Sequence, residues 1–197
     1  IPIKEEYLLT SELENTNEMY AIAKIAGLKM CKAYNTQFKT DFRAIMPTNL
    51  YGQNDNYDSL NSHVLAALIK KIVLAKKQNK KSFIVWGTGN PKREFLHVDD
   101  LADATVKIMN LSKSKYNKVA GEKFPFINVG SGSDISIKDL AKKISKIVGF
   151  KGKMIFDKSK PDGTFRKLMD NTKLKKIKWK PKISLNYGIK KTIVDFK

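Results

Sequence analysis

Short apolar segments alternate with amphipathic helices along this chain, and this alternation restricts the possible folds more than any other feature. The apolar periodicity predicts helices at 17–38, 61–78, 97–111 and 136–149, and strands at 41–52, 82–87, 124–132 and 153–157. Strands and helices that alternate in this way are typical of a largely parallel sheet covered by helices. The sequence therefore predicts an α/β fold.

The connections between these segments carry polar residues and glycines. Residues 88–94 are predicted to form a turn, 112–124 a lysine-rich loop and 158–167 a turn-rich loop. In parallel sheets, ligands bind beyond the carboxyl ends of the strands. The segments at such ends are "PTNLYG", "WGTGNPKRE" and "NVGSGSD". We expect a binding site where these segments meet.

The formal net charge of +19 over 197 residues suggests a polyanionic partner, such as nucleic acid, a membrane surface or a phosphorylated substrate. The lysines are spread along the whole chain, however, and accompany many asparagine and isoleucine residues. The sequence has no zinc-finger spacing, RNA-binding signature or arginine-rich arm. We therefore interpret most of the charge as solvated surface lysine and expect neither a nucleic-acid nor a membrane partner.

Other features of the sequence favour a cytoplasmic protein. No apolar run is long enough for a membrane span, and residues 1–18 lack the apolar segment of a signal peptide. The single cysteine, Cys31, excludes an internal disulfide framework, and its helical setting predicts a buried, unreactive thiol. We expect no metal site. The chain opens on Ile1 rather than methionine, which suggests a fragment or a processed product.

Tyr20 and Lys24 are four residues apart in a predicted helix, so they share one face. A neighbouring cation favours the ionised form of a phenol, and such a pair can donate a proton to a carbonyl oxygen near neutral pH. The spacing alone is a weak signal, because tyrosine and lysine occur at this separation by chance in many helices. The surrounding sequence therefore decides how the pair is interpreted.

That surrounding sequence resembles a known superfamily. "YAIAKIAG" is similar to the active-site helix of the short-chain dehydrogenases/reductases, and "PTNLYG", "REFLHVDDLA" and "NVGSG" follow in the order of the extended, nucleotide-sugar-modifying branch. More narrowly, "NEMYAIAKIAGLKMCKAYN", "NSHVLAALIKK", "VWGTGNPKREFLHVDDLA" and "KPDGTFRKLMD" resemble the GDP-L-fucose synthase family. The resemblance covers nearly all of residues 1–196.

The resemblance implies a partial Rossmann-type parallel sheet with a smaller C-terminal α/β lobe that binds substrate. Residues 1–52 would form the back part of the dinucleotide-binding domain, and 53–197 mainly the substrate-binding lobe. Residues 97–132 or so would return to the dinucleotide-binding domain. The family's Gly-rich dinucleotide-binding unit is not found in this sequence, and we expect it to lie before Ile1, together with a catalytic cysteine. We therefore expect this polypeptide alone to be inactive and to bind NADPH weakly or not at all.

The resemblance also assigns catalytic roles. Tyr20 would be the general acid that protonates the C4 oxygen of a keto sugar, and Lys24 would lower its pKa and bind the nicotinamide ribose. His63 would exchange a proton at C3 or C5 and contact the cofactor, because imidazole titrates near neutrality. A polar helix cap is the alternative role for His63. His97 is expected to support the structure.

Binding residues are implied in the same way. Cofactor contacts are expected from Lys24, His63 and the segment Pro47, Thr48, Asn49 and Leu50. The GDP-sugar would be bound by Asn49, Lys71, Trp86, Arg93, Asp162 and Lys167. Lys71 stands where the family typically has arginine. A lysine keeps the positive charge but cannot donate two parallel hydrogen bonds to a diphosphate, as a planar guanidinium can. Asp162 could instead be a simple turn residue.

The reaction implied is the NADPH-dependent conversion of GDP-4-keto-6-deoxy-D-mannose to GDP-L-fucose, by epimerisation at C3 and C5 followed by reduction at C4. The cofactor would be NADP(H), and the intact enzyme is expected to be a homodimer through helices that include the one bearing Tyr20. One alternative is another nucleotide-sugar epimerase, dehydratase or reductase of the same branch. The other is a non-catalytic module whose lysine-rich surface captures polyanions.

Overall fold

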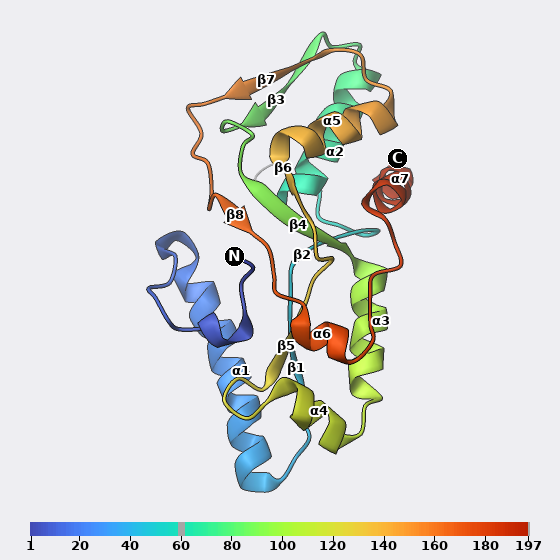
Figure 1. The fold of residues 1–197 in the computed structure, drawn as a ribbon. Helices are drawn as coiled ribbons and strands as arrows, with labels where there is room; N and C mark the ends of the chain where they lie inside the picture. The colour runs from blue at the N-terminus through green and yellow to red at the C-terminus, as the bar shows by residue number, and fades with distance from the viewer. Residues whose placement is uncertain (59–61, 197) are drawn as a thin grey trace.

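The computed structural model describes residues 1–58 and 62–196, which form an elongated molecule (Figure 1). Its α-helices are α1 (Glu18–Phe38), α2 (Val64–Lys77), α3 (Val98–Met109), α4 (Lys113–Ala120), α5 (Ile137–Val148), α6 (Thr172–Lys176) and α7 (Leu185–Phe196). Its strands are β1 (Ala44–Pro47), β2 (Asn49–Tyr51), β3 (Ser82–Trp86), β4 (Lys92–His97), β5 (Phe126–Val129), β6 (Asp134–Ser136), β7 (Lys153–Asp157) and β8 (Arg166–Lys167). Two 3₁₀ turns, Glu5–Tyr7 and Asn15–Asn17, precede α1.

The described strands form three small groups. β1 pairs with β5, β3 pairs with β7, and β4 lies between β2 and β6 and also pairs with β8. Every one of these pairings is parallel except that of β4 with β6. The predicted α/β fold with a largely parallel sheet is therefore confirmed.

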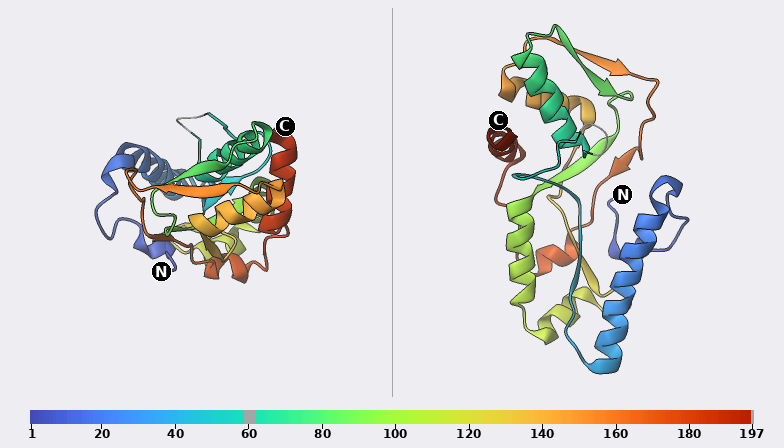
Figure 2. Two further views of the ribbon diagram at one scale, coloured as in Figure 1. Left: turned by 90° about the horizontal axis from the view of Figure 1, so that it is seen from above. Right: turned by 180° about the vertical axis from the view of Figure 1, so that it is seen from behind.

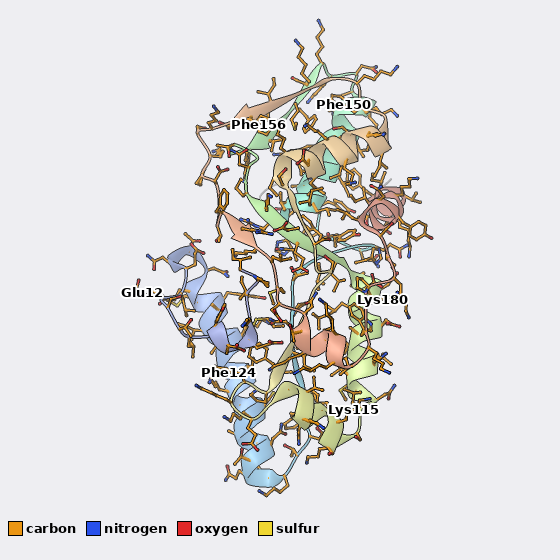
Figure 3. The ribbon with its side chains drawn as sticks, viewed as in Figure 1. Glu12, Lys115, Phe124, Phe150, Phe156 and Lys180 are labelled. Atoms are coloured by element: carbon orange, nitrogen blue, oxygen red, sulfur yellow. The ribbon has the colours of Figure 1, made fainter. Side chains whose placement is uncertain are left out.

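Two hydrophobic clusters form the core, and they lie toward opposite ends of the molecule. The first packs α2, α5 and α7 against β3, and the second packs α3, α4 and α6 around β5. Adjacent residues of β4 belong to different clusters, Phe95 to the first and Leu96 to the second. Side chains alternate between the faces of a strand, so β4 connects the two clusters. Phe150 and Phe156 lie at the first end and Phe124 at the second (Figure 3).

Helices α2, α3 and α5 and strand β7 lie where the periodicity predicts them. The ends of α5 show why. Ser136 Oγ accepts a hydrogen bond from the Asp139 N–H at 3.0 Å and donates one to the Asp139 carboxylate at 2.6 Å. At the other end Gly149 adopts a φ of 71°, the left-handed conformation that ends many helices.

Three local predictions are wrong. Residues 92–94, predicted to be part of a turn, belong to β4, because this segment pairs on both sides, with β6 and with β8. The lysine-rich segment 112–124 contains α4, which buries Tyr116 and Ala120 and has Ser112 as its N-cap. The predicted strand at 41–52 is interrupted at Thr48, where the chain passes from the partner of β5 to the partner of β4.

Helix α1 lies along one side of the molecule (Figure 2). It contains no buried residue, although apolar side chains recur along it at helical spacing. Cys31 is half-buried rather than fully buried as predicted, because no described segment covers this part of the helix completely. Among the residues that the structure describes, no helix is long and apolar enough to cross a membrane.

Candidate active site

A cavity of about 190 Å³ lies between the end of β3, the start of β4 and the loop after β7. Its lining residues are Val64, Trp86, Gly89, Pro91, Arg93, Ile137, Pro161, Asp162 and Gly163. The fold thus brings together three residues predicted to bind substrate, Trp86, Arg93 and Asp162. Trp86 ends β3 and Asp162 follows β7, at the carboxyl ends of two parallel strands where ligand sites are expected, while Arg93 lies near the start of β4.

Trp86 is the last residue of β3, and its side chain is 53% exposed. The Nζ atom of Lys71 lies 4.6 Å from the centre of the Trp86 ring, within the range of a cation–π contact. Burial lowers the pKa of Lys71, while the nearby Asp157 opposes that shift. Lys160 approaches the same ring, with its Nζ atom 5.6 Å from the centre. Two ammonium groups therefore adjoin the indole that borders the cavity.

Arg93 supplies further positive charge at the cavity, and Lys167 lies in the neighbouring strand. They are register partners in the parallel strands β4 and β8, so their backbones lie side by side. The guanidinium Nη1 of Arg93 donates hydrogen bonds to the carbonyl oxygens of Lys92 and Thr164. Partial burial lowers the pKa of this guanidinium, and Asp162 opposes the shift. Cations grouped in this way suit a diphosphate.

Asp162 lies on the cavity wall, but its described hydrogen bonds go to the protein. One carboxylate oxygen accepts from the Thr88 N–H at 2.9 Å, and the other accepts from the Thr88 hydroxyl at 2.5 Å. These bonds to Thr88 hold the pKa of Asp162 below its usual value. The geometry therefore resembles the turn role that the sequence left open for this residue.

The segment Pro47 to Leu50 does not line the cavity but is bonded to β4, the strand that contains Arg93. The side chains of Thr48 and Asn49 both donate to the carbonyl oxygen of Glu94, at 3.2 Å and 2.9 Å. Pro47 is in register with Val129 of β5, and Leu50 is in register with Leu96 of β4. Because Glu94 follows Arg93, the predicted cofactor segment is tied to the strand that borders the predicted substrate cavity.

Tyr20 and Lys24 lie in the first part of α1, as predicted. Lys24 Nζ is 5.3 Å from the centre of the Tyr20 ring, and the tyrosine side chain is 62% exposed. Figure 1 shows this end of α1 directed toward the part of the molecule that carries β8. The two groups are thus adjacent and accessible, as proton transfer to a bound carbonyl requires.

His63 is the residue at the N-cap position of α2, directly before the cavity residue Val64. Its side chain makes no cap hydrogen bond. The alternative role of His63 as a polar cap therefore has no support in the geometry. His97, by contrast, is buried, and its Nδ1 accepts from the Asp99 N–H at 3.2 Å to cap α3. The structural role predicted for His97 is confirmed.

Glu94 contributes to the site but was not found from the sequence. Its carboxylate is fully buried and accepts hydrogen bonds from the Gly132 N–H at 2.6 Å and the Met169 N–H at 2.9 Å. It thereby fixes two loops next to Arg93. A charged residue in the otherwise apolar run "EFLHV" was the available signal. Thr88 and Lys160, which gave no comparable signal, were also missed.

The residues present suit the ribose of a nicotinamide cofactor. Among the described residues, Lys24 makes no ion pair or hydrogen bond, so its ammonium can donate to ribose hydroxyls. No group of three or more histidine, cysteine, aspartate or glutamate side chains in residues 1–58 and 62–196 could hold a metal ion.

Comparison with known proteins gives consistent results. Residues 1–122 match the model of the NAD dependent epimerase/dehydratase family. The chain is 54% identical to putative GDP-L-fucose synthase 2 of Arabidopsis thaliana, over 97% of this chain and 56% of that protein. It is 49% identical to GDP-L-fucose synthase of Escherichia coli K12, over 97% of this chain and 60% of that protein. The chain thus spans less than two thirds of these relatives.

Solved structures show the same similarity. A GDP-D-glycero-L-gluco-heptose synthase from Campylobacter jejuni, determined with NADPH, superimposes with a TM-score of 0.88 at 36% identity, covering 99% of this chain and 65% of that one. A GDP-L-fucose synthetase from Naegleria fowleri bound to NADP gives 0.86 at 29% identity, covering 99% and 60%.

Proposed function

The chain belongs to the NAD dependent epimerase/dehydratase family, and on this basis we propose that the protein is an NADPH-dependent enzyme that converts GDP-4-keto-6-deoxy-D-mannose to GDP-L-fucose. The observation that carries the proposal is the cavity where Trp86 and Arg93 meet beside Lys71. An aromatic ring and grouped cations match the base and diphosphate of a nucleotide sugar. The relatives named above are GDP-L-fucose synthases, which supports guanosine as the nucleoside.

The C4 reduction is a proton-coupled hydride transfer. NADPH, when bound, supplies the hydride that reaches C4 of the keto sugar. Tyr20 gives its hydroxyl proton to the C4 oxygen as that oxygen gains charge, and Lys24 stabilises the tyrosinate that forms. Lys24 would also donate a hydrogen bond to the ribose of the cofactor. Thr48 and Asn49, whose side chains donate to the carbonyl oxygen of Glu94, would contact the nicotinamide end of the cofactor.

The epimerisation at C3 and C5 needs a group that can exchange protons near neutral pH. Carbon atoms beside the C4 ketone are acidic, because the carbanion formed is delocalised onto the ketone oxygen. A base on one face of the sugar, for which the resemblance implies a cysteine thiolate, would remove the proton from such a carbon, and His63 would donate a proton to the opposite face and so invert the carbon. Its position before Val64 supports this role, as does the lack of a cap hydrogen bond from its side chain to the described residues of α2.

The assembly that we propose is a homodimer through α1. Large apolar side chains on this helix are between 46% and 76% exposed: Met19, Ile22, Met30 and Tyr34. This is more exposed apolar surface than a helix that faces only solvent usually carries. A second copy that covers part of this face would remove apolar surface from water. Sedimentation of the protein expressed from its complete reading frame should give twice the monomer mass.

A second candidate is a different GDP-sugar reductase. GDP-L-colitose synthase of Yersinia pseudotuberculosis is 43% identical over 96% of this chain and 59% of that protein, and a C. jejuni neighbour is a GDP-D-glycero-L-gluco-heptose synthase. The test is to incubate the protein, expressed from its complete reading frame, with NADPH and GDP-4-keto-6-deoxy-D-mannose and to identify the product. GDP-L-fucose is expected, whereas a product with unchanged C3 and C5 would contradict the proposal.

A further inference from the structure

Glu94 of β4 is a fully buried carboxylate, although it directly follows Arg93, which lines the cavity. Its Oε1 accepts a hydrogen bond from the Gly132 N–H at 2.6 Å, and its Oε2 accepts one from the Met169 N–H at 2.9 Å. The Ser131 hydroxyl also donates to Oε1, at 3.5 Å, and none of these described partners is a cation. Burial of a carboxylate costs free energy that these bonds must offset, whereas an apolar side chain of the same size would avoid that cost.

The backbone of the loop after β5 is shaped around this carboxylate. A Cβ atom on Gly130 would lie 2.4 Å from Oε1 of Glu94 and 2.9 Å from Oε2. Only glycine lets the main chain approach the carboxylate so closely. Because Gly130 directly follows β5, the Glu94 side chain holds the loop at the point where this strand ends.

The main chain of Glu94 holds a second segment. Its carbonyl oxygen accepts from the side chains of Thr48 and Asn49, in the predicted cofactor segment. The Thr48 N–H in turn donates to the carbonyl oxygen of Val129, the last residue of β5, at 3.0 Å. With the bond from Gly132, these contacts form a closed contact ring, in which β4, the cofactor segment and the end of β5 each bind the other two.

The bond from Met169 extends the contact ring to the start of the chain. Ile3 forms a parallel bridge with Met169. The Ile3 N–H donates to the Leu168 carbonyl oxygen at 2.8 Å, and the Ile3 carbonyl oxygen accepts from the Asp170 N–H at 2.8 Å. Through Glu94, the first residues of the chain are therefore linked to the predicted cofactor segment.

We propose that Glu94 is a positioning residue for ketone reduction: its carboxylate maintains the contact ring, and the contact ring sets the cofactor segment 47–50 relative to the cavity that Arg93 lines. The Glu94 side chain is fully buried, so it acts through these backbone contacts and not by touching a ligand. Hydride transfer is sensitive to such alignment, because a displacement of about 1 Å can cost roughly 100-fold in rate. The inference rests on the proposed function for the reaction, but not for the contact ring itself.

The first test needs no ligand and measures hydrogen exchange of single backbone amides. In the protein expressed from its complete reading frame, Glu94→Gln keeps the shape of the side chain but places an amide NH2 group opposite one of the two backbone N–H donors. The amides of Gly132, Met169 and Thr48 should then exchange about 10- to 100-fold faster, the range of a lost hydrogen bond to a charged group. The amide of Ile144, in the middle of α5, should not change.

Two further variants make this test decisive. Ser131→Ala removes only the longest contact of the carboxylate and should leave all of these amides unchanged. Gly130→Ala places a methyl group against the carboxylate and should accelerate the same three amides, so it tests the contact ring even if Glu94→Gln does not fold. An unchanged Thr48 amide in these two disruptive variants would overturn the contact ring, as would unprotected exchange of Gly132 in the unsubstituted protein.

The second test measures the alignment. A single turnover of NADPH with saturating, already epimerised keto sugar gives a rate constant that does not depend on how much of the protein is folded. This rate constant should fall about 10- to 100-fold in Glu94→Gln, whereas GDP affinity by calorimetry should stay within about threefold of wild type. Ser131→Ala should match the wild type in both. An unchanged rate constant would refute the positioning role, and equal losses of rate and affinity would show that Glu94 only supports the cavity.

The two tests also distinguish this inference from the proposed function. If the unsubstituted protein reduces no keto sugar but Glu94→Gln still accelerates all three amides, the contact ring stands and the proposed reaction is wrong. If the keto sugar is reduced and the three amides do not respond together, the reaction stands and the positioning role of Glu94 is wrong.

Discussion

The Nζ atom of Lys24 lies 5.3 Å from the centre of the Tyr20 ring, one turn further along α1. The contact places a positive charge beside an accessible phenol. A cation in this position stabilises the tyrosinate left behind when the hydroxyl gives up its proton. The pair therefore has the geometry of a general acid with a neighbouring cation. The first prediction concerns this pair.

In the protein expressed from its complete reading frame, Tyr20→Phe should lower kcat for ketone reduction by roughly 100- to 10,000-fold, the usual contribution of a positioned general acid. GDP affinity should stay within about twofold of wild type, because Tyr20 is not among the cavity residues. Stopped-flow measurement of NADPH oxidation gives the rate, and calorimetry gives the affinity. Tyr34→Phe, on the same helix, is the matched control. Normal reduction by the Tyr20→Phe variant would exclude this residue as the acid.

His63→Gln should separate epimerisation from reduction. With deuterated water as solvent, the wild-type protein should incorporate deuterium at C3 and C5 of the sugar, and the variant should lose most of it. The imidazole can exchange protons near neutral pH, but an amide cannot. Hydride transfer to C4 of a substrate that is already epimerised should survive within about tenfold. Mass spectrometry of the product gives both quantities, and full deuterium incorporation by the variant would argue against His63.

Much of this fold could be predicted from the sequence, because capping residues, apolar spacing and helix-ending glycines indicated the same elements. In α5, the spacing of Ser136 and Asp139, an apolar stripe and Gly149 all indicate the same helix, and the structure has it. Helix α4 was missed because it has as many lysines as apolar residues, three of each, and only Tyr116 and Ala120 are fully buried. The high lysine content of this segment made its short amphipathic pattern hard to detect in the sequence.

The candidate site could be predicted only in part from the sequence, for a related reason. Trp86, Arg93 and Asp162 could be proposed from motifs, since each lies in a short segment with its own signature. The partner of Asp162 could not, because Thr88 is 74 residues away and the contact depends on how β3 and β7 pair. Long-range register is set by the whole core, and no local pattern around either residue encodes it.

His97 predicts a pH dependence of stability. Burial lowers its pKa below the ordinary value, and Asp99 opposes this only in part. The neutral ring accepts the cap hydrogen bond from the Asp99 N–H, and a proton on Nδ1 would remove that acceptor. The unfolded chain therefore binds this proton more readily than the folded one. The contribution is complete above about pH 6.5, the ordinary histidine value, and is lost as pH falls from there through the folded pKa.

Thermal unfolding from pH 7.5 down to pH 5.5 measures this dependence. Tm should fall more steeply for the wild type than for His97→Asn, because asparagine can cap a helix and does not titrate. A steeper fall in the variant would contradict the assigned role. Carboxylates with lowered pKa values contribute mainly at lower pH, so this window isolates the imidazole.

Ser136→Ala should destabilise the protein by about 1 kcal/mol, the usual cost of losing an N-cap side chain. For a chain of this size the expected fall in Tm is about 2–4 °C. Ser136→Thr keeps a hydroxyl at the cap and should recover most of the loss. Because Ser136 lies outside the cavity, GDP affinity should not change in either variant. Differential scanning calorimetry measures the effect, and an unchanged Tm in Ser136→Ala would show that the cap contributes nothing.

Lys71 provides the last prediction, because its ammonium lies 4.6 Å from the centre of the Trp86 ring and its pKa is lowered by burial. If this charge meets the diphosphate, Lys71→Met should weaken GDP binding by roughly tenfold or more, the cost of losing a charged hydrogen bond. Lys71→Arg should bind at least as tightly as the wild type, since a guanidinium stacks on an indole and grips two phosphate oxygens. It should also keep its affinity to higher pH, where a lysine of lowered pKa loses its proton first. Calorimetry at pH 7 and pH 9.5 tests both points. Equal losses in the two variants would show that lysine is needed for its shape and not for its charge.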